Sequence, residues 1–332
     1  MRNTRVVLTA LGEPDVLKQI EDEVREPGAH EVRVRITVCG VAFADVLMRR
    51  GLYPDVPTLP YSPGYDIVGV VEACGGGVTQ WRVGDLVTAL TMTGGYSQYI
   101  VLAESEFVRV PEGLDPAGAV SLVLNYTTAY QLIHRIAKLQ RGESVLIHGA
   151  AGGVGTAALQ LGALAGLKMF GTASKAKHGL VAALGGVPID YRAENFVERA
   201  RGVDAVFDAV GGRNWLRSYQ ALGRGGRFVG YGISAAIEGG RKHMMLAGAS
   251  FAWLWLAGLL PGKSACWYSI TTERKKNSAW FREDLTRLLE MLREKLIAPV
   301  VAERLPLCDA ARAHELLEKA SVSGKIVLMC QE

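Results

Sequence analysis

Cysteine is scarce in this sequence and follows no pairing pattern. The five cysteines are widely spaced among 332 residues, and none forms a CxxC pair. An odd number of cysteines at such spacing predicts neither a disulfide framework nor a zinc ribbon. We therefore expect a protein of a reducing compartment, with the cytoplasm as its location.

Charge of one sign and targeting signals are lacking as well. Lys and Arg number 37 against 33 Asp and Glu, and the net charge of +4 is scattered along the chain. No basic surface for nucleic acid is indicated. The first residues lack an apolar run of signal-peptide length. Apolar residues, in contrast, make up 49% of the chain, which is enough for a sizeable core in about two domains.

A glycine-rich turn follows the apolar run Val145–Ile147. Residues 144–155 read SVLIHGAAGGVG, a strand, a turn and the start of a helical pattern. In such a turn, backbone N–H groups and the helix N-terminus bind a dinucleotide pyrophosphate. Ala150 replaces the first glycine of the usual fingerprint, so the match is partial. The alternative is a glycine-rich strand end that binds no ligand. The candidate phosphate contacts are Ala151, Gly152, Gly153 and Val154.

Strand-like and helix-like segments alternate after this turn, which strengthens the nucleotide interpretation. The expected strands are 168–173, 187–191, 204–210, 226–232 and 266–270, and the expected helices are 155–166, 177–184 and 215–222. Such alternation predicts a doubly wound parallel sheet.

The end of the second strand indicates which nucleotide is bound. An acid placed there would hold the ribose 2′-hydroxyl of NAD, but residues 172–178 read TASKAKH and contain none. Ser174, Lys175 and Lys177 offer a hydroxyl and positive charge to a 2′-phosphate, so NADPH is the expected cofactor, and Tyr191 is a candidate to pack beside the same phosphate. The alternative is that the lysines are solvated charges at a helix start.

The regions on either side differ in character. Residues 1–123 look all-β, and they suggest a small barrel with strands at 31–38, 67–73, 85–89 and 99–102. An amphipathic helix is expected over 280–295, and a last strand over 325–329. The resulting domains are 1–123, 124–272 for the nucleotide, and 273–332 as a return to the first.

Several motifs in order along the chain now carry a family resemblance. They are CGVAFADVLMRRGLYP (39–54), PGYDIVGVV (63–71), LNYTTAY (124–130), HGAAGGVG (148–155) and SGKIVL (323–328). The chain resembles the zinc-free quinone oxidoreductase branch of the medium-chain dehydrogenase/reductase superfamily, in particular its vesicle amine transport protein subgroup. The resemblance implies an α/β fold, a GroES-like β-barrel catalytic domain plus a Rossmann domain, with the active site in the cleft between them, and a homodimer.

The motif positions that hold metal ligands in zinc alcohol dehydrogenases are occupied here by Ala42, Tyr65 and Leu124. A catalytic zinc needs about three Cys, His or carboxylate ligands. We therefore expect no metal. Cys39 is nearby in sequence, and we interpret it as a buried packing residue.

Without a metal to polarise an isolated carbonyl, a conjugated acceptor is the better substrate. The resemblance implies an NADPH-dependent reductase of quinones or α,β-unsaturated carbonyls, with a hydrophobic small-molecule substrate. Tyr53 is the first candidate to donate a hydrogen bond to the developing oxyanion; the alternative is an aromatic plug that shapes the pocket. Phe43 and Asn125 are further catalytic candidates. An NADPH-binding protein of low turnover, with a structural or membrane-associated role, is the alternative function, weakly supported because Ala42 replaces the family's Asn.

Thr128 belongs to the LNYTTAY motif, which lies near the nicotinamide end of the cofactor in relatives. Four further candidates for cofactor binding fall at the ends of expected strands, where a doubly wound sheet binds its nucleotide; they are Val210, Tyr231, Gly232 and Ile233. Asp45 is as consistent with bracing its loop as with catalysis. His148 is interpreted as structural, and Asp208 as closing a strand.

The apolar segment Met244–Leu260 does not fit a simple soluble domain. Its seventeen residues lie at the lower limit for a membrane span, but a span would interrupt the nucleotide domain before its sixth strand. We expect instead an apolar helix that covers the substrate cleft or a subunit contact, with Trp253 and Trp255 lining it. Peripheral contact with a membrane is the lesser hypothesis.

Overall fold

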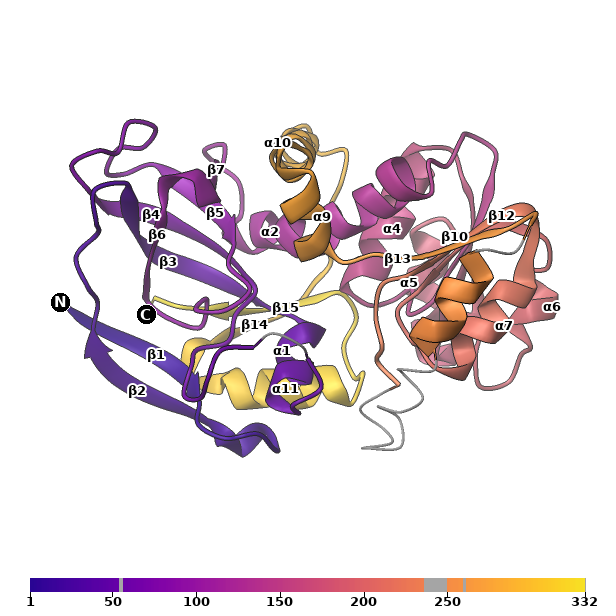
Figure 1. The fold of residues 1–332 in the computed structure, drawn as a ribbon, viewed down its shortest axis with the longest axis horizontal. Coiled ribbons are helices and arrows are strands. Elements are labelled where there is room, and N and C mark those ends of the chain that lie inside the picture. Colours follow the sequence, from indigo (N-terminus) through magenta and orange to yellow (C-terminus); the bar gives the residue numbers. More distant parts are fainter. Residues whose placement is uncertain (54–55, 236–249, 259–260, 332) are drawn as a thin grey trace. The chain divides into compact units, whose positions relative to one another are not determined.

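The chain divides into two compact units, each with a hydrophobic core of its own. The computed structural model describes residues 1–53, 56–235, 250–258 and 261–331 (Figure 1). The first unit combines Met1–Leu124 with the chain from Leu285 onward, and the second is Asn125–Asp284. The second unit extends beyond residue 272, because the Asp284 carboxylate accepts hydrogen bonds from Gln131 and Arg135 of that unit.

The second unit contains a six-stranded parallel sheet. Its strands are β8 (Ser144–Ile147), β9 (Lys168–Ala173), β10 (Gly186–Asp190), β11 (Val203–Asp208), β12 (Leu222–Gly230) and β13 (Ser264–Trp267). They lie in the order β10-β9-β8-β11-β12-β13. Counted along the chain this is 3-2-1-4-5-6, the order of dinucleotide-binding sheets, with its switch point between β8 and β11. The predicted doubly wound sheet is confirmed.

Helices connect these strands. They are α3 (Thr127–Tyr130), α4 (Gly153–Leu164), α5 (His178–Ala183), α6 (Phe196–Arg199), α7 (Arg213–Ala221) and α9 (Ile270–Lys276), while α10 (Ser278–Arg293) continues into the first unit. Wide π-helical turns occupy Leu122–Tyr126 and Gln131–Ile136 on either side of α3. Such turns often mark functional sites, and Asn125 lies in the first of them.

Most element boundaries differ from the sequence expectation by a few residues; the largest shift is that β12 begins at Leu222 rather than 226, where the sequence predicts the end of a helix. Three of the differences have local explanations. β11 ends at Asp208 rather than 210, because the Asp208 carboxylate accepts the N–H groups of the next turn. β13 ends at Trp267, because Ser269 already caps α9 by accepting the N–H of Thr272 at 3.5 Å. α4 begins at Gly153 instead of 155, directly after its N-cap, Gly152.

The first unit is built on a seven-stranded sheet. Its path runs β14-β15-β3-β4-β5-β7, and β6 pairs with β3. The strands are β3 (Glu31–Val41), β4 (Asp66–Cys74), β5 (Leu86–Leu90), β6 (Tyr99–Ala103), β7 (Phe107–Arg109), β14 (Val301–Pro306) and β15 (Lys325–Met329); β1 (Arg2–Leu8) and β2 (Leu17–Glu23) form a separate antiparallel pair. β15 pairs antiparallel with β3, so the two ends of the chain complete one sheet.

The expectation that residues 1–123 are all-β is wrong. This part also contains α1 (Phe43–Arg49) and α2 (Pro116–Ser121), and α11 (Ala310–Glu318) belongs to the same unit. Asp45 caps α1 by accepting the Ala42 N–H at 2.8 Å, and Val46 and Met48 are buried. The helix is too short to show a clear period in the sequence, which is why it was missed.

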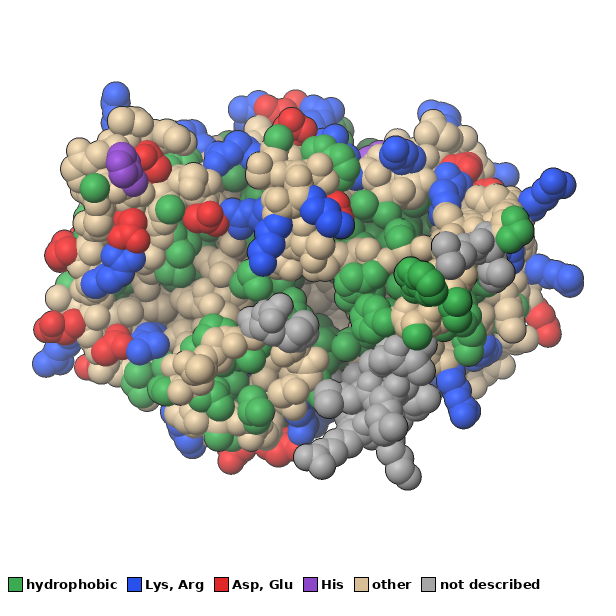
Figure 2. Space-filling view, in the orientation of Figure 1, with side chains coloured by type: hydrophobic (Ala, Val, Ile, Leu, Met, Phe, Trp, Pro, Cys, Tyr) green, Lys and Arg blue, Asp and Glu red, His purple; other side chains and the backbone are tan. Residues whose placement is uncertain are grey.

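Within the described ranges, no helix has both the length and the apolar character needed to cross a membrane. Of the segment Met244–Leu260, residues 244–249 and 259–260 lie outside the described residues, and 250–258 are helical. Trp253 packs edge-on against Tyr219 and Phe228. Trp255 is 69% exposed, and hydrophobic side chains gather on this part of the surface (Figure 2).

Candidate functional site

The glycine-rich turn lies at the switch point of the parallel sheet. β8 ends at Ile147, and α4 begins at Gly153. Gly149 has a φ of +64°, which glycine adopts without strain. A Cβ on Gly155 would collide with the Gly149 carbonyl oxygen, so the helix can approach the strand only because residue 155 is glycine. The turn therefore presents the N-terminus of α4 at the carboxyl edge of the sheet, where the first N–H groups of a helix have no partner within the helix.

Ala150 makes a structural contact that explains its departure from the fingerprint. It is fully buried, and its N–H donates to the Thr172 carbonyl of β9 at 3.0 Å. Its methyl group lies over Gly171, where an added Cβ would be 2.7 Å away. The alanine fills the space between the turn and β9, whereas Ala151 and Gly152 lead into α4, whose first residues are Gly153 and Val154.

The second strand ends without a carboxylate. β9 closes at Ala173, which pairs with Asp190 of β10, so Ser174 and Tyr191 follow neighbouring strand ends. Lys175 is exposed, and burial lowers the pKa of Lys177.

Two further groups follow these strands: Tyr191 comes directly after β10, and His178 is the first residue of α5. Tyr191 is 51% exposed, and the Arg192 guanidinium lies 5.5 Å from the centre of its ring. His178 has a buried Nε2 with no hydrogen-bond partner among the described residues. This part of the sheet edge therefore combines positive charge with an unused polar atom.

A buried hydrogen-bond chain crosses the switch point. His148 Nδ1 lies 3.1 Å from Thr172 Oγ1, and His148 Nε2 lies 2.9 Å from Ser218 Oγ. Ser218 donates to Asp208 Oδ2 at 2.6 Å. All four side chains are at most 3% exposed. The chain thus joins the carboxyl ends of β9, β8 and β11 through α7.

The proton positions in this hydrogen-bond chain follow from the neutral His148 and from the Asp208 carboxylate at one end. Burial lowers the pKa of His148, which keeps the imidazole neutral with one donor and one acceptor nitrogen. Ser218 gives its proton to the Asp208 carboxylate, so it accepts from His148 Nε2, and Nδ1 accepts from Thr172. Thr172 in turn accepts the N–H of Gly149 at 3.3 Å. Every member is satisfied, as a buried polar network requires.

Most nucleotide-unit residues singled out in the sequence lie around this edge. Tyr231 donates its N–H to the Asp208 carbonyl at 2.9 Å, and Gly232 packs on Ala209, whose carbonyl oxygen would lie 2.7 Å from an added Cβ. Val210 donates its N–H to the Asp208 carboxylate at 2.7 Å. Burial raises the pKa of Tyr231. These strand ends form one wall beside the glycine turn.

The remaining residues of this unit approach from the π-helical turn and the following helix. The Asn125 side chain contacts the backbone of Gly153, where an added Cβ would collide with its amide nitrogen. Thr128 follows in α3 and is 4% exposed. Ile233 lies against Gly211, with its Cα 3.0 Å from where a Cβ would be. The amide of Asn125 therefore lies at the start of α4.

In the first unit, two tyrosine hydroxyls are joined. Tyr53 Oη lies 2.9 Å from Tyr65 Oη, and Tyr65 is 2% exposed whereas Tyr53 is half-buried. Phe43 is the first residue of α1.

Asp45 braces the backbone on both sides of this pair. Its carboxylate accepts the N–H of Ala42 at 2.8 Å and that of Gly64 at 3.1 Å, and the Tyr96 hydroxyl lies 3.3 Å away. Burial raises the pKa of Asp45 to about 7, against the lowering effect of the two N–H donors. The geometry supports the bracing role over a catalytic one.

Comparison with known proteins places the chain in a family. Two family models match, the alcohol dehydrogenase GroES-like domain over residues 28–112 and the zinc-binding dehydrogenase over residues 184–328. The Homo sapiens quinone oxidoreductase is 31% identical over 340 residues, covering 99% of this chain and 98% of that protein. The chain belongs to the quinone oxidoreductase branch of the medium-chain dehydrogenase/reductase superfamily.

Two further relatives agree with this assignment. The Danio rerio synaptic vesicle membrane protein VAT-1 homolog is 32% identical over 336 residues, covering 97% of this chain and 69% of that protein. The Escherichia coli quinone oxidoreductase complexed with NADPH superimposes with a TM-score of 0.88 at 29% identity, covering 98% of this chain and 99% of the other. The GroES-like plus Rossmann fold and the oxidoreductase class are thereby confirmed.

The residues of this oxidoreductase do not fit a catalytic zinc at the position used by zinc alcohol dehydrogenases. Ala42, Tyr65 and Leu124 offer a methyl group, a phenol and an isobutyl group there. Among the residues that the structure describes, no three His, Cys, Asp or Glu side chains gather as a metal site would require. Cys39 is fully buried beside Cys330, with 3.7 Å between the sulfur atoms.

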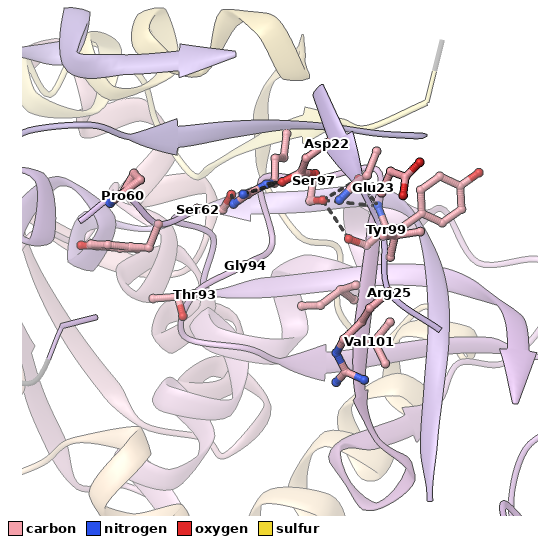
Figure 3. Close-up of a pocket in the computed structure, with 15 residues that line it drawn as sticks. Asp22, Glu23, Arg25, Pro60, Ser62, Thr93, Gly94, Ser97, Tyr99 and Val101 are labelled. Atoms are coloured by element: carbon pink, nitrogen blue, oxygen red, sulfur yellow. Dashed lines mark hydrogen bonds and ion pairs between the residues drawn. The ribbon is translucent and has the colours of Figure 1, made fainter. Parts of the chain in front are cut away.

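A groove of about 410 Å³ opens elsewhere in the oxidoreductase's first unit (Figure 3). It lies between the β1–β2 pair and the segments that carry Ser62, Thr93 and Tyr99. Among its charged side chains, Arg5 pairs with Asp22 at 2.5 Å, whereas Arg25 pairs with Glu31, which does not line the groove. None of the site residues predicted from the sequence lines it.

Sequence reasoning missed the partners that hold the site residues. Tyr65, Tyr96, Ser218 and Asn214 contact them from other elements: Tyr96 lies 51 residues from Asp45 and Ser218 lies 70 residues from His148, whereas Asn214 donates to Asp208 at 2.8 Å from six residues away. No local motif marks such partners. The one available signal was Tyr65 itself, an unusual residue at a position where the zinc enzymes have His.

Proposed function

We propose that this protein is an NADPH-dependent, zinc-independent reductase that transfers hydride to a quinone or an α,β-unsaturated carbonyl compound. The observation that carries the proposal is the carboxyl edge of the parallel sheet. There the glycine turn lies beside the end of the second strand, which is followed by Ser174, Lys175 and Lys177 and by no carboxylate. The Escherichia coli relative complexed with NADPH supports the same cofactor.

The residues present fit NADPH. The N-terminus of α4 suits the pyrophosphate, and Gly152 beside it is exposed. Lys175, Lys177 and the unpartnered Nε2 of His178 suit the 2′-phosphate, with Tyr191 beside it. Bound NADPH would supply the hydride. Asn125, Thr128 and the strand-end residues Val210, Tyr231, Gly232 and Ile233 would hold and orient the rest of the molecule.

The side chains of the first unit suit a conjugated acceptor. A quinone or enone spreads the developing charge over its own π-system, so the protein needs only to align it and donate to the oxyanion. Tyr53 would donate this hydrogen bond, and Phe43 would pack against the hydrophobic substrate. Tyr65, Ala42 and Leu124 bring a phenol and two hydrocarbon side chains to the positions of the zinc ligands, which is consistent with a reaction that uses no Lewis acid.

The test is NADPH consumption by the purified protein with four acceptors: a benzoquinone, a naphthoquinone, a medium-chain 2-enone and a 2-enoyl thioester. Turnover with at least one of them is expected, and the preferred acceptor assigns the substrate class. Tight NADPH binding without reduction of any acceptor would contradict the proposal.

One observation favours a second candidate function, an NADPH-binding protein of low turnover at a membrane surface. Phe251, Trp255 and Leu256 on the helix 250–258 are 39%, 69% and 55% exposed. Aromatic and aliphatic side chains of this kind insert into lipid interfaces. Co-sedimentation with anionic liposomes, lost on Trp255→Ser, would support this function; failure to sediment would contradict it.

We also propose that the protein is a homodimer, with β13 as the strand at the subunit contact. β13 is an edge strand, and Trp267 at its end is 37% exposed. An unpaired apolar edge is a template for a second strand.

A further inference from the structure

Tyr65 forms the hydrogen bond that reaches the proposed donor, Tyr53. The two hydroxyl oxygens are 2.9 Å apart, a normal O–H···O distance. The two side chains differ in exposure, because Tyr65 is 2% exposed and Tyr53 is half-buried. One phenol of the pair is therefore held inside the protein, and the other reaches a partly open surface.

The backbone around Tyr65 is held rigidly. The Tyr65 carbonyl accepts the N–H groups of Thr91 at 2.9 Å and Met92 at 3.2 Å. Gly64 before it donates its N–H to Asp45, and a Cβ on Gly64 would lie 2.6 Å from the Cα of Gly95. Gly64 also has a φ of +109°, which side-chain-bearing residues rarely adopt. The Tyr65 hydroxyl is thus presented at a fixed place.

A fixed hydroxyl can control the direction of its neighbour's proton. If Tyr65 donates to Tyr53 Oη, the proton of Tyr53 must point away from Tyr65, toward any acceptor on the open side. Hydrogen bonds in series polarise each other, so the second donor is also strengthened. A donor aligned in advance stabilises a developing oxyanion without reorganisation.

We propose that Tyr65 is a positioning residue: its hydroxyl donates to Tyr53 and so directs the Tyr53 proton to the oxygen of the reduced substrate. This inference rests on the proposed reductase function. It assigns Tyr65 a role through Tyr53 alone, with no contact of its own to substrate.

The test is a double-mutant cycle of Tyr53→Phe and Tyr65→Phe, with kcat and KM measured separately for the preferred acceptor. Tyr53→Phe is expected to lower kcat ~100-fold. Tyr65→Phe is expected to lower kcat ~10-fold at unchanged KM, since a direct donor remains but is no longer aligned. The double variant should match Tyr53→Phe alone. Tyr65 replaced by 3-fluorotyrosine, which keeps the bond, should retain kcat within about twofold.

Tyr61→Phe is the matched control. Tyr61 is 7% exposed in the same region, and its hydroxyl has no hydrogen-bond partner among the described residues. It should leave kcat unchanged. Full activity in Tyr65→Phe would overturn the proposal, as would a further ~10-fold loss when Tyr65→Phe is added to Tyr53→Phe.

A binding measurement separates this inference from the proposed function. 4-Nitrophenolate resembles the developing oxyanion, and its affinity should fall ~10-fold in Tyr65→Phe but not in Tyr61→Phe. This titration needs no turnover. If the wild type reduces no acceptor, the reductase function fails, while equal 4-nitrophenolate affinity in wild type and Tyr65→Phe would overturn the positioning role on its own.

Discussion

At the scale of single residues, two opposing effects act on the pKa of Asp45. Its carboxyl is fully buried, which raises its pKa to about 7, although two backbone N–H groups donate to it. His314 nearby shows the opposite effect, because burial lowers its pKa to about 3. Tyr96 links the two, with its hydroxyl 3.0 Å from His314 Nε2 and 3.3 Å from Asp45. Both groups are therefore neutral in the folded protein under mildly acidic conditions.

Asp45→Asn should isolate the contribution of Asp45 to the pH dependence of stability. A folded-state pKa raised above the unfolded value stabilises the protein at low pH, and this stabilisation is lost as pH rises through about 7. Between pH 5 and pH 8, the wild type should lose about 3 kcal/mol relative to the variant. Urea unfolding at both pH values measures this difference. His314 changes stability in the opposite direction but equally in both proteins, so it cancels.

Asp15→Asn is the matched control, since Asp15 is exposed. It should show no such pH-dependent difference from the wild type. A free-energy difference between wild type and Asp45→Asn that stays constant from pH 5 to pH 8 would show that Asp45 does not titrate in this range.

Ser174→Asp should reverse the nucleotide preference. A carboxylate at the end of β9 would accept from a ribose 2′-hydroxyl and repel a 2′-phosphate. We expect the Kd for NADPH to rise ~100-fold, and NADH to bind more tightly than in wild type. Titration of nucleotide fluorescence measures both constants. Lys168→Asp, at the opposite end of β9, should leave the preference unchanged; an NADPH affinity unaffected by Ser174→Asp would place the 2′-phosphate elsewhere.

At the scale of elements, the nucleotide edge depends on contacts between strands that no motif encodes. The His148 hydrogen-bond chain fixes three strand ends relative to each other, and one of its members, Ser218, comes from α7. The glycine turn itself could be read from the sequence, because strand, glycine and helix signals are local. The partners of His148 and Asp208 could not, since they lie 24 and 10 residues away and meet only in the folded sheet.

Ser218→Ala should destabilise the carboxyl edge of the parallel sheet. It removes the link between His148 Nε2 and the Asp208 carboxylate, leaving buried polar atoms unpaired. A loss of about 2 kcal/mol in unfolding free energy is expected, together with weaker NADPH binding, because Gly149 and Val210 are held through this chain.

Ser121→Ala provides the comparison for this change. Ser121 is 1% exposed, but its hydroxyl donates only to the Ala117 carbonyl within its own helix. Its replacement should lower the unfolding free energy much less than Ser218→Ala does, and it should leave the NADPH affinity unchanged. Equal losses of unfolding free energy in Ser218→Ala and Ser121→Ala would show that the His148 hydrogen-bond chain contributes no more stability than one buried hydroxyl.

At the scale of the whole molecule, the features of the fold that could be predicted are those with local sequence signals, and the features that could not are those held by contacts between distant segments. The doubly wound sheet follows from alternating local signals, and the return of the C-terminal strand follows from the family motifs. The helices α1 and α11 were missed because their stability comes from contacts between distant segments: Arg49 of α1 pairs with Glu318 of α11 at 2.6 Å. Tertiary contacts of this kind override weak local patterns.

The proposed dimer gives a prediction for the assembled molecule. The parallel sheet has two edges, β10 and β13, and both carry an exposed apolar side chain, Val187 at 46% and Trp267 at 37%. Trp267→Arg should convert the dimer to a monomer, because it places a charge at the strand proposed for the contact. Val187→Arg makes the same kind of change at the opposite edge and should leave the dimer intact. Size-exclusion chromatography with light scattering measures both masses; a monomeric wild type, or dissociation by Val187→Arg alone, would contradict an interface through β13.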